Sequence, residues 1–220
     1  MIKVYYYKIE KVSPLFTERE KKLFRLISPR KIQRISSAVS EEVRRTSFYG
    51  EIITLGLLVS EYSVTSLPRI EYSEKGKPFL SGGSYFFNIS HTGGCIFIAF
   101  SDSEIGIDAE IRRVYDRKIA SKCFSSAELS LLDNASDKDG AFTRIWTRKE
   151  AYVKYTGQGI DLSLFRDIDS FDRRIRTVSV KDRYTLSVFS EKESDEIILR
   201  EITPEMNTQI FNSLEPLVYD

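Results

Sequence analysis

Apolar and polar residues alternate over residues 105–111, a pattern that predicts a half-buried β-strand. The apolar face of this strand would carry Ile105, Ile107, Ala109 and Ile111. Asp108 and Glu110 lie between these positions, so their carboxylates share the opposite face. The sequence thus places two acidic side chains next to each other on one strand.

Apolar residues recur at helical spacing over residues 141–155, and this stripe predicts a helix packed against a core. The stripe consists of Phe142, Ile145, Trp146 and Val153. Lys149 falls inside the stripe, which favours a side chain that reaches outward from the edge of a core. Glu150 and Lys154 are one turn apart at the margin of the stripe, and Gly157 is the expected end of the helix.

Similar patterns predict the other elements of a mixed α and β chain. Further strands are expected at residues 3–9, 85–89, 95–100, 184–190 and 197–202. Because a charged segment separates the last two strands, we expect them to form a hairpin. Further helices are expected from Thr17, from Ser28-Pro29, from Ser40 to about residue 62, and at residues 125–133. A polar break at residues 101–103 predicts two lobes, residues 1–102 and 103–220.

The two acidic strand residues, together with Glu150 and Lys154, would form one site if strand and helix converge. Mg²⁺ prefers oxygen ligands and commonly takes one or two carboxylates, leaving positions for water and phosphate. A lysine beside such a cation would neutralise phosphate charge. The pattern also fits the solvated face of an edge strand and an ordinary i,i+4 ion pair, which is worth roughly 0.2–0.5 kcal/mol.

Composition narrows the chemistry that is available to the chain. With 220 residues, 41% of them hydrophobic and 30% charged, it is an ordinary globular sequence. A net charge of +1 offers no general attraction for nucleic acid or an anionic membrane. The longest apolar run, residues 52–59, is too short to span a bilayer, and the N-terminus lacks the order of a signal peptide. We therefore expect a cytoplasmic protein.

A single histidine and two cysteines, Cys95 and Cys123, argue against a zinc or iron site. They also weaken a serine or cysteine nucleophile, because Ser90 and His91 are neighbours that point to opposite faces of an extended chain. Neither a GxxxxGKS/T loop nor a GxGxxG motif after a strand is present. If the chain handles phosphate, carboxylate-held magnesium and scattered basic groups must do so.

Basic residues gather in the N-terminal part of the chain, namely Arg30, Lys31, Arg34, Arg44 and Arg45. They fit either a solvated basic face or a cluster that holds a terminal phosphate through charge-assisted hydrogen bonds. Lys77, in a turn at residues 74–78, is a further phosphate candidate. His91 lies in the turn at residues 90–94, where it is more often a loop histidine than a ligand unless an anion binds there.

Five short motifs occur together and in a fixed order. The first three are Gly76-Lys77-Pro78, Asn88-Ile89-Ser90-His91-Thr92 and Gly106-Ile107-Asp108-Ala109-Glu110. The last two are Phe124-Ser125-Ser126-Ala127-Glu128 and Trp146-Thr147-Arg148-Lys149-Glu150-Ala151-Tyr152-Val153-Lys154, and Arg45-Thr46 is a weaker match upstream. With this highly specific ordered set, which spans about the middle third of the chain, the sequence resembles the 4'-phosphopantetheinyl transferases of the two-lobed surfactin-synthetase type.

The resemblance implies an α+β fold made of a pseudo-twofold pair of similar lobes, with coenzyme A bound in the cleft between them. It implies the transfer of 4'-phosphopantetheine from coenzyme A to a serine of an acyl or peptidyl carrier protein. Adenosine 3',5'-bisphosphate would be released. By analogy with the family, the length of the chain favours a pseudodimeric monomer over the shorter, one-lobed relatives.

The resemblance also implies roles for individual residues. Asp108, Glu110 and Glu150 would coordinate Mg²⁺ against the pyrophosphate of coenzyme A, and Lys154 would neutralise that pyrophosphate. Glu150 is also the expected base for the incoming serine, directly or through water. The residues expected to touch the adenosine or the phosphates are Lys31, Arg34, Arg45, Lys77, Ser90 and His91. Lys75 departs from the pattern, since relatives commonly have an aromatic residue there.

Two alternative functions share parts of this pattern. A non-catalytic module of the same fold would bind coenzyme A or a nucleotide without turnover, but it would have no use for the intact acidic residues and Lys154. A magnesium-dependent nuclease would need a basic groove for a polyanion. A net charge of +1 and the absence of an aromatic and basic stripe argue against a nuclease.

Overall fold

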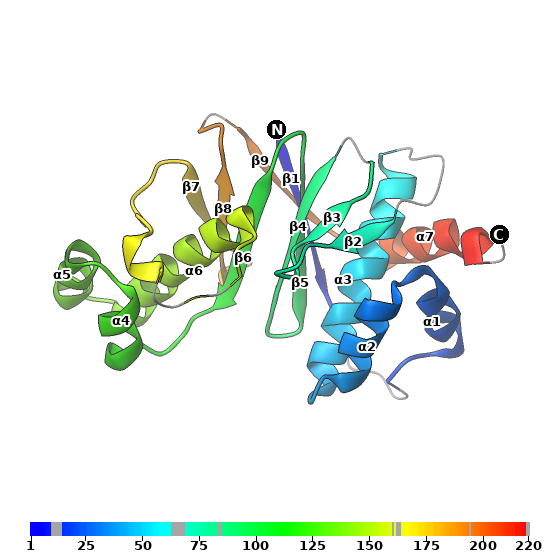
Figure 1. Cartoon of the computed structure of the whole chain (residues 1–220), viewed down its shortest axis with the longest axis horizontal. Coiled ribbons are helices and arrows are strands. Elements are labelled where there is room, and N and C mark those ends of the chain that lie inside the picture. The colour runs from blue at the N-terminus through cyan, green and yellow to red at the C-terminus, as the bar shows by residue number, and fades with distance from the viewer. Residues whose placement is uncertain are drawn as a thin grey trace.

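The computed structural model of this chain describes residues 1–9, 15–62, 69–82, 85–159, 161, 164–193 and 195–218. The fold is a mixed α+β arrangement in which two sheets lie between two groups of helices (Figure 1). The predicted mixture of helices and strands is confirmed.

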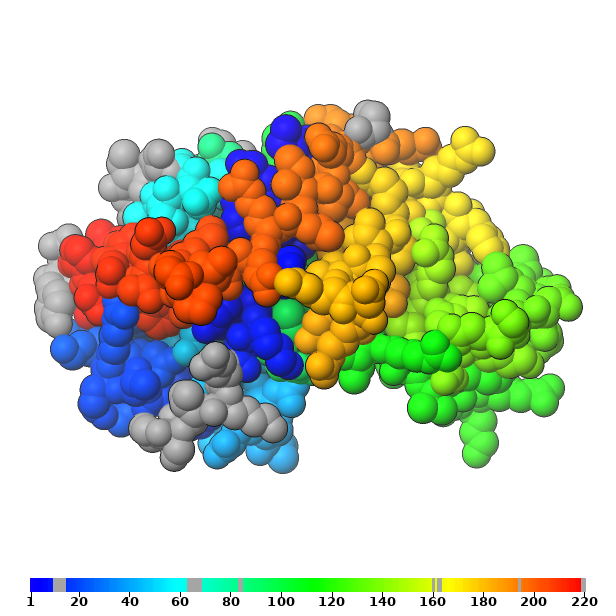
Figure 2. Space-filling view, turned by 180° about the vertical axis from the view of Figure 1, so that it is seen from behind, coloured from blue at the N-terminus to red at the C-terminus, as the bar shows by residue number. Residues whose placement is uncertain are grey.

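The first sheet has four strands in the order β4-β5-β1-β9. Their bounds are Phe86–Thr92 for β4, Cys95–Ser101 for β5, Ile2–Lys8 for β1 and Ile197–Glu201 for β9. β1 runs antiparallel to β5 and parallel to β9, with Ile2 opposite Ile197. Figure 2 shows the orange strand β9 beside the blue β1. The hairpin predicted from residues 184–190 and 197–202 is therefore wrong: both strands form, but they belong to different sheets.

The second sheet has three antiparallel strands in the order β6-β8-β7. β6 spans Ile105–Ile111, as predicted, β8 spans Tyr184–Ser190 and β7 spans Ile175–Val180. The apolar face of β6 packs against the first sheet in a shared core that includes Val4, Phe97, Ile105, Ile107 and Ala109. Ile111 is the exception, because at the end of the strand it is 38% exposed.

Helices α1 (Glu18–Leu23), α2 (Pro29–Ser37), α3 (Glu41–Ser60) and α7 (Pro204–Leu214) cover the outer face of the first sheet (Figure 1). The predicted helix starts are confirmed. Thr17 and Glu20 form a capping box at α1, and the hydroxyls of Ser28 and Ser40 accept backbone N–H bonds at α2 and α3. A small hairpin of β2 (Ile70–Tyr72) and β3 (Pro78–Leu80) lies beside them.

Helices α4 (Arg117–Cys123), α5 (Ser126–Asn134) and α6 (Lys138–Thr156) lie on the other side of the second sheet (Figure 1). α6 begins three residues earlier than predicted because the Asp137 carboxylate caps the Gly140 N–H, and it ends as predicted before Gly157, whose φ is 68°. Gly106 lets α6 approach β6 closely, since a Cβ there would lie 2.1 Å from the Ala151 carbonyl oxygen.

Single 3-10 turns complete the fold at η1 (Phe24–Leu26), η2 (Phe165–Asp167) and η3 (Glu215–Val218). Among the described helices, none is both long and apolar enough to cross a membrane. The division into lobes at residue 102 stays a prediction, and β9 and α7 pack with β1 and α3 although they follow the second sheet in the sequence.

Candidate functional site

The acidic face of β6 meets α6 at the point where Lys154 emerges from the helix. The Lys154 Nζ lies 2.7 Å from the Asp108 Oδ1. Asp108 and Glu150 are only 5% and 6% exposed, whereas Glu110 and Lys154 are half-buried. The structure thus joins the predicted strand and helix through the Asp108–Lys154 ion pair, and neither residue lies on a freely solvated face.

Ser90 connects this pair to the first sheet. Its hydroxyl donates to the Asp108 Oδ1 at 3.0 Å and accepts a hydrogen bond from the Lys154 Nζ, also at 3.0 Å. Ser90 belongs to β4, Asp108 to β6 and Lys154 to α6, so three elements from separate parts of the sequence meet in one closed set of contacts.

Glu110 is held by both of its carboxylate oxygens. The Thr92 hydroxyl donates to Oε2 at 3.0 Å, and the Arg113 guanidinium binds Oε1 at 3.1 Å. Arg113 in turn lies over the ring of Trp146, 4.7 Å from its centroid. The sequence does not reveal the contact with Thr92, since it depends on how β4 packs against β6. Arg113 is only three residues from Glu110, so its position in the sequence is the signal that could have pointed to it.

Burial and mutual repulsion set the protonation of the carboxyl groups. Burial, together with the nearby negative charge of Asp108, raises the pKa of Glu150 to about 7, and the Lys154 ammonium only partly opposes this. The same two causes, burial and Asp108, raise the pKa of Glu110. Concentrated negative charge in a buried place favours the binding of a cation.

The donor atoms fit a hard cation such as Mg²⁺, which binds carboxylate oxygens. The Asp108 Oδ2 is buried and makes no hydrogen bond, so this carboxylate oxygen is available to bind a cation. Within the described ranges, however, no three or more histidine, cysteine, aspartate or glutamate side chains are grouped closely enough to hold a metal ion. The metal assignment of Asp108, Glu110 and Glu150 therefore stays a prediction.

Of the residues predicted to bind the adenosine or the phosphates, Ser90 belongs to the site itself, and His91 lies near both Lys154 and Lys31. His91 belongs to β4 and not to the turn expected at residues 90–94, and partial burial of its ring, together with the charges of Lys154 and Lys31, lowers its pKa. Lys31 and Arg34 lie on α2, where their cationic groups are 5.9 and 5.8 Å from the centroid of the Tyr72 ring. Lys154 of α6 and Lys31 of α2 thus both lie close enough to His91 to affect its charge.

Two other candidates have partners within the protein. The Lys77 Nζ binds the Glu104 Oε2 at 2.5 Å and the Tyr155 carbonyl oxygen at 2.7 Å, which links the β2–β3 hairpin to the end of α6. Arg45 is buried in α3, with 5% of its surface exposed. The phosphate contacts predicted for both residues stay predictions.

Lys149 is fully buried, so the prediction that it reaches outward from the edge of the core is wrong. Its Nζ forms an ion pair of 2.8 Å with Glu128 and donates to the carbonyl oxygens of Phe165 and Ile168, both at 2.6 Å. Glu128 also caps α5 by accepting the Ser125 N–H at 2.7 Å. The capping pattern of Ser125 and Glu128 was the sequence signal that could have pointed to Glu128.

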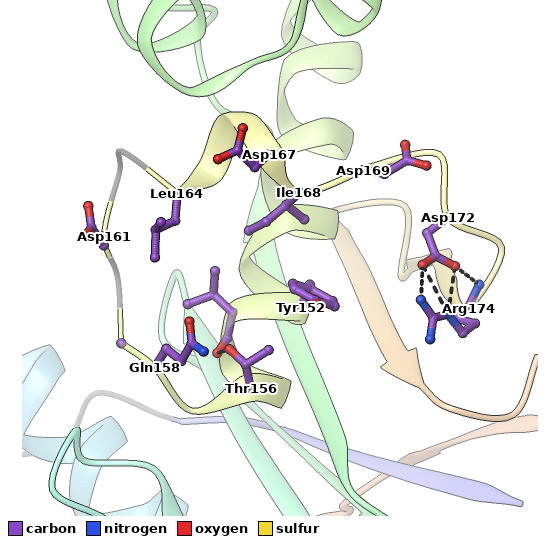
Figure 3. Close-up of a pocket in the computed structure, with 12 residues that line it drawn as sticks. Tyr152, Thr156, Gln158, Asp161, Leu164, Asp167, Ile168, Asp169, Asp172 and Arg174 are labelled. Atoms are coloured by element: carbon purple, nitrogen blue, oxygen red, sulfur yellow. Dashed lines mark hydrogen bonds and ion pairs between the residues drawn. The ribbon is translucent and has the colours of Figure 1, made fainter.

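A cavity of about 390 Å³ lies on the C-terminal part of α6 (Figure 3). Its lining includes Tyr152, Thr156, Leu164 and Ile168, and the ion pair of Asp172 and Arg174 stands at one end. None of the predicted site residues lines it. The cavity therefore lies outside the predicted site.

Comparison with known proteins identifies relatives that cover this region. The model of the 4'-phosphopantetheinyl transferase superfamily matches residues 104–202, a range that includes Asp108, Glu110, Glu150 and Lys154. The chain is 31% identical over 167 residues to 4'-phosphopantetheinyl transferase Sfp of Bacillus subtilis (strain 168), covering 74% of this chain and 72% of that protein. It is 38% identical over 121 residues to 4'-phosphopantetheinyl transferase AcpT of Salmonella typhimurium, covering 52% of this chain and 60% of that protein.

Proposed function

Because this chain belongs to the 4'-phosphopantetheinyl transferase superfamily, we propose that it transfers 4'-phosphopantetheine from coenzyme A to a serine of an acyl or peptidyl carrier protein. The observation that carries the proposal is the closed contact of Lys154, Asp108 and Ser90 next to the buried Glu150. This contact brings an ammonium, a hydroxyl and carboxylates together at one place. Phosphoryl transfer needs such groups to position the reactants and to stabilise the charge that develops on the phosphate oxygens.

In the proposed reaction the serine oxygen forms a bond to the phosphorus that carries the pantetheine arm. The bond from that phosphorus to the bridging oxygen of the pyrophosphate breaks, and adenosine 3',5'-bisphosphate leaves with the electron pair. Glu150 accepts the serine proton, directly or through water. Lys154 stabilises the charge that grows on the phosphate oxygens.

We assign Asp108, Glu110 and Glu150 to Mg²⁺, and the unused Asp108 Oδ2 supports this assignment. When bound, Mg²⁺ would neutralise charge on the pyrophosphate as a Lewis acid. Around it, the side chains of this chain would bind the rest of coenzyme A. We assign the adenosine and the phosphates to Lys31, Arg34, Arg45, Lys77, Ser90 and His91.

The proposal includes the finer architecture that the family implies. The lobes 1–102 and 103–220 would form a pseudo-twofold pair, with coenzyme A in the cleft between them, in a chain that acts as a monomer in the cytoplasm. Support for a site shared by the two lobes comes from the Ser90–Asp108 hydrogen bond of 3.0 Å, which joins a residue before the division to one after it.

Mass spectrometry of apo carrier proteins incubated with coenzyme A and Mg²⁺ tests the proposal. We expect one phosphopantetheine adduct on at least one carrier in a panel drawn from fatty acid, polyketide and peptide synthesis. Asp108→Ala should abolish the adduct while circular dichroism shows a retained fold. Asp102→Ala is a matched control, since this carboxylate is 64% exposed. Tight binding of coenzyme A without any adduct across the panel would instead indicate the non-catalytic module.

A further inference from the structure

β6 is the edge strand of the second sheet, and β4 of the first sheet covers its free edge. Side chains of β4, not its backbone, bind the outward N–H groups of β6. Asn88 Oδ1 accepts the Ile107 N–H at 3.0 Å, Ser90 Oγ accepts the Ala109 N–H at 3.1 Å, and Thr92 Oγ1 accepts the Ile111 N–H at 3.4 Å. Two sheets are thus joined by a row of side-chain hydrogen bonds.

The spacing of this row follows from strand geometry. Residues 88, 90 and 92 alternate along β4, so they share one face, and residues 107, 109 and 111 present their N–H groups along one edge of β6. An uncovered edge strand would leave these N–H groups to water or to another chain. The row therefore fixes the register of β6 against β4. It also fixes where Asp108 and Glu110 lie relative to Ser90 and Thr92.

Thr92 differs from Asn88 in that it also binds a carboxylate. A hydroxyl has one proton to donate. Because the Thr92 oxygen accepts the Ile111 N–H, that proton is available to the Glu110 Oε2, which lies 3.0 Å away. The other oxygen of Glu110 is held by Arg113 at 3.1 Å. Both oxygens of Glu110 are thereby oriented before any ligand arrives.

We propose that Thr92 is a positioning residue, which orients the Glu110 carboxylate for Mg²⁺ from the opposite sheet. This inference rests on the proposed function, which assigns Glu110 to the metal. Groups that orient a metal ligand through a hydrogen bond typically contribute 10- to 100-fold to metal affinity. Loss of the Thr92 hydroxyl is therefore expected to weaken Mg²⁺ binding about 10-fold.

The experiment compares Thr92→Val, which removes the hydroxyl at nearly constant shape, with Thr92→Ser, which keeps it. Thr185→Val is the matched control, because Thr185 stands opposite Glu110 on β8 and, in the described part of the chain, its hydroxyl makes no hydrogen bond. Mg²⁺ is titrated calorimetrically into each protein with coenzyme A present and no carrier protein, so that no turnover occurs. Urea denaturation of each variant measures any loss of stability.

We expect Thr92→Val to raise the Mg²⁺ dissociation constant about 10-fold, while Thr92→Ser and Thr185→Val stay within about 2-fold of the wild type. An unchanged constant in Thr92→Val, or an equal rise in Thr185→Val, would overturn the inference. If Thr92→Val does not fold, Thr92→Ala carries the same expectation. A wild-type protein that binds no Mg²⁺ and modifies no carrier would overturn the proposed function instead. This result differs from one in which only the inference about Thr92 fails, because the wild type then still binds Mg²⁺.

Discussion

Replacing Glu150 with glutamine is expected to stabilise the folded chain above pH 7 while removing the proposed activity. Glu150 is 6% exposed and lies near the negative charges of Asp108 and Glu110. A neutral glutamine has nearly the same shape but avoids both the cost of burying a charge and the repulsion from its neighbours.

The size of the effect follows from the pKa. Burial and Asp108 raise the pKa of Glu150 from the ordinary 4.5 to about 7 in the folded state. A folded state with the higher pKa holds its proton more tightly than the unfolded chain, so the contribution of Glu150 to stability is lost as the pH rises from 4.5 to about 7. At about 1.4 kcal/mol per pKa unit, the loss is on the order of 3 kcal/mol at most.

Urea denaturation of the metal-free wild type and Glu150→Gln at pH 5 and pH 8 measures the difference. We expect similar unfolding free energies at pH 5 and an advantage of about 1–3 kcal/mol for the variant at pH 8. A variant that is less stable than the wild type at pH 8, or a difference that does not change with pH, would show that Glu150 does not have a raised pKa. Titrating groups that lie away from Glu150 are common to both proteins and cancel in the comparison.

Two further substitutions test the packing that supports the site. Lys149→Met leaves the buried charge of Glu128 without its ion pair and should cost about 3–5 kcal/mol of unfolding free energy. Adding Glu128→Gln removes that charge but keeps an oxygen for the Ser125 N–H, so the double variant should recover part of the loss. A loss below about 1 kcal/mol in the single variant would contradict this. Gly106→Ala should sharply lower the melting temperature, because the new Cβ would lie 2.1 Å from a carbonyl oxygen of α6. Gly50→Ala in α3 is its control, since that Cβ meets a side chain at 3.4 Å and should be tolerated. Equal melting temperatures in the two glycine variants would rule out the close approach as the cause.

Local patterns in the sequence predicted those features that depend on neighbouring residues. The capping box of Thr17 and Glu20 and the shared face of Asp108 and Glu110 follow from the periods of helix and strand, and both predictions are confirmed. Lys154 could be placed one turn from Glu150 for the same reason.

Features that depend on the packing of distant segments could not be predicted in this way. The pattern of a strand does not show which other strand it pairs with. Proximity in the sequence therefore predicts that residues 197–202 pair with residues 184–190, whereas β9 pairs with β1. The contact of Thr92 with Glu110 needs two sheets in register. Lys149 was misjudged because its partner Glu128 lies on another helix, and only such a partner makes full burial of an ammonium tolerable.

The pairing of β1 with β9 affects how the protein can be made. β1 leaves the ribosome well before its neighbour β9, which begins at Ile197. At about 5–20 residues per second, roughly 10–40 s of translation separate the two strands. During that time one edge of β1 has no partner and is open to chaperones or to other nascent chains. The first sheet, which contains β4 and its contacts with Asp108 and Glu110, is therefore completed only after β9 has been synthesised.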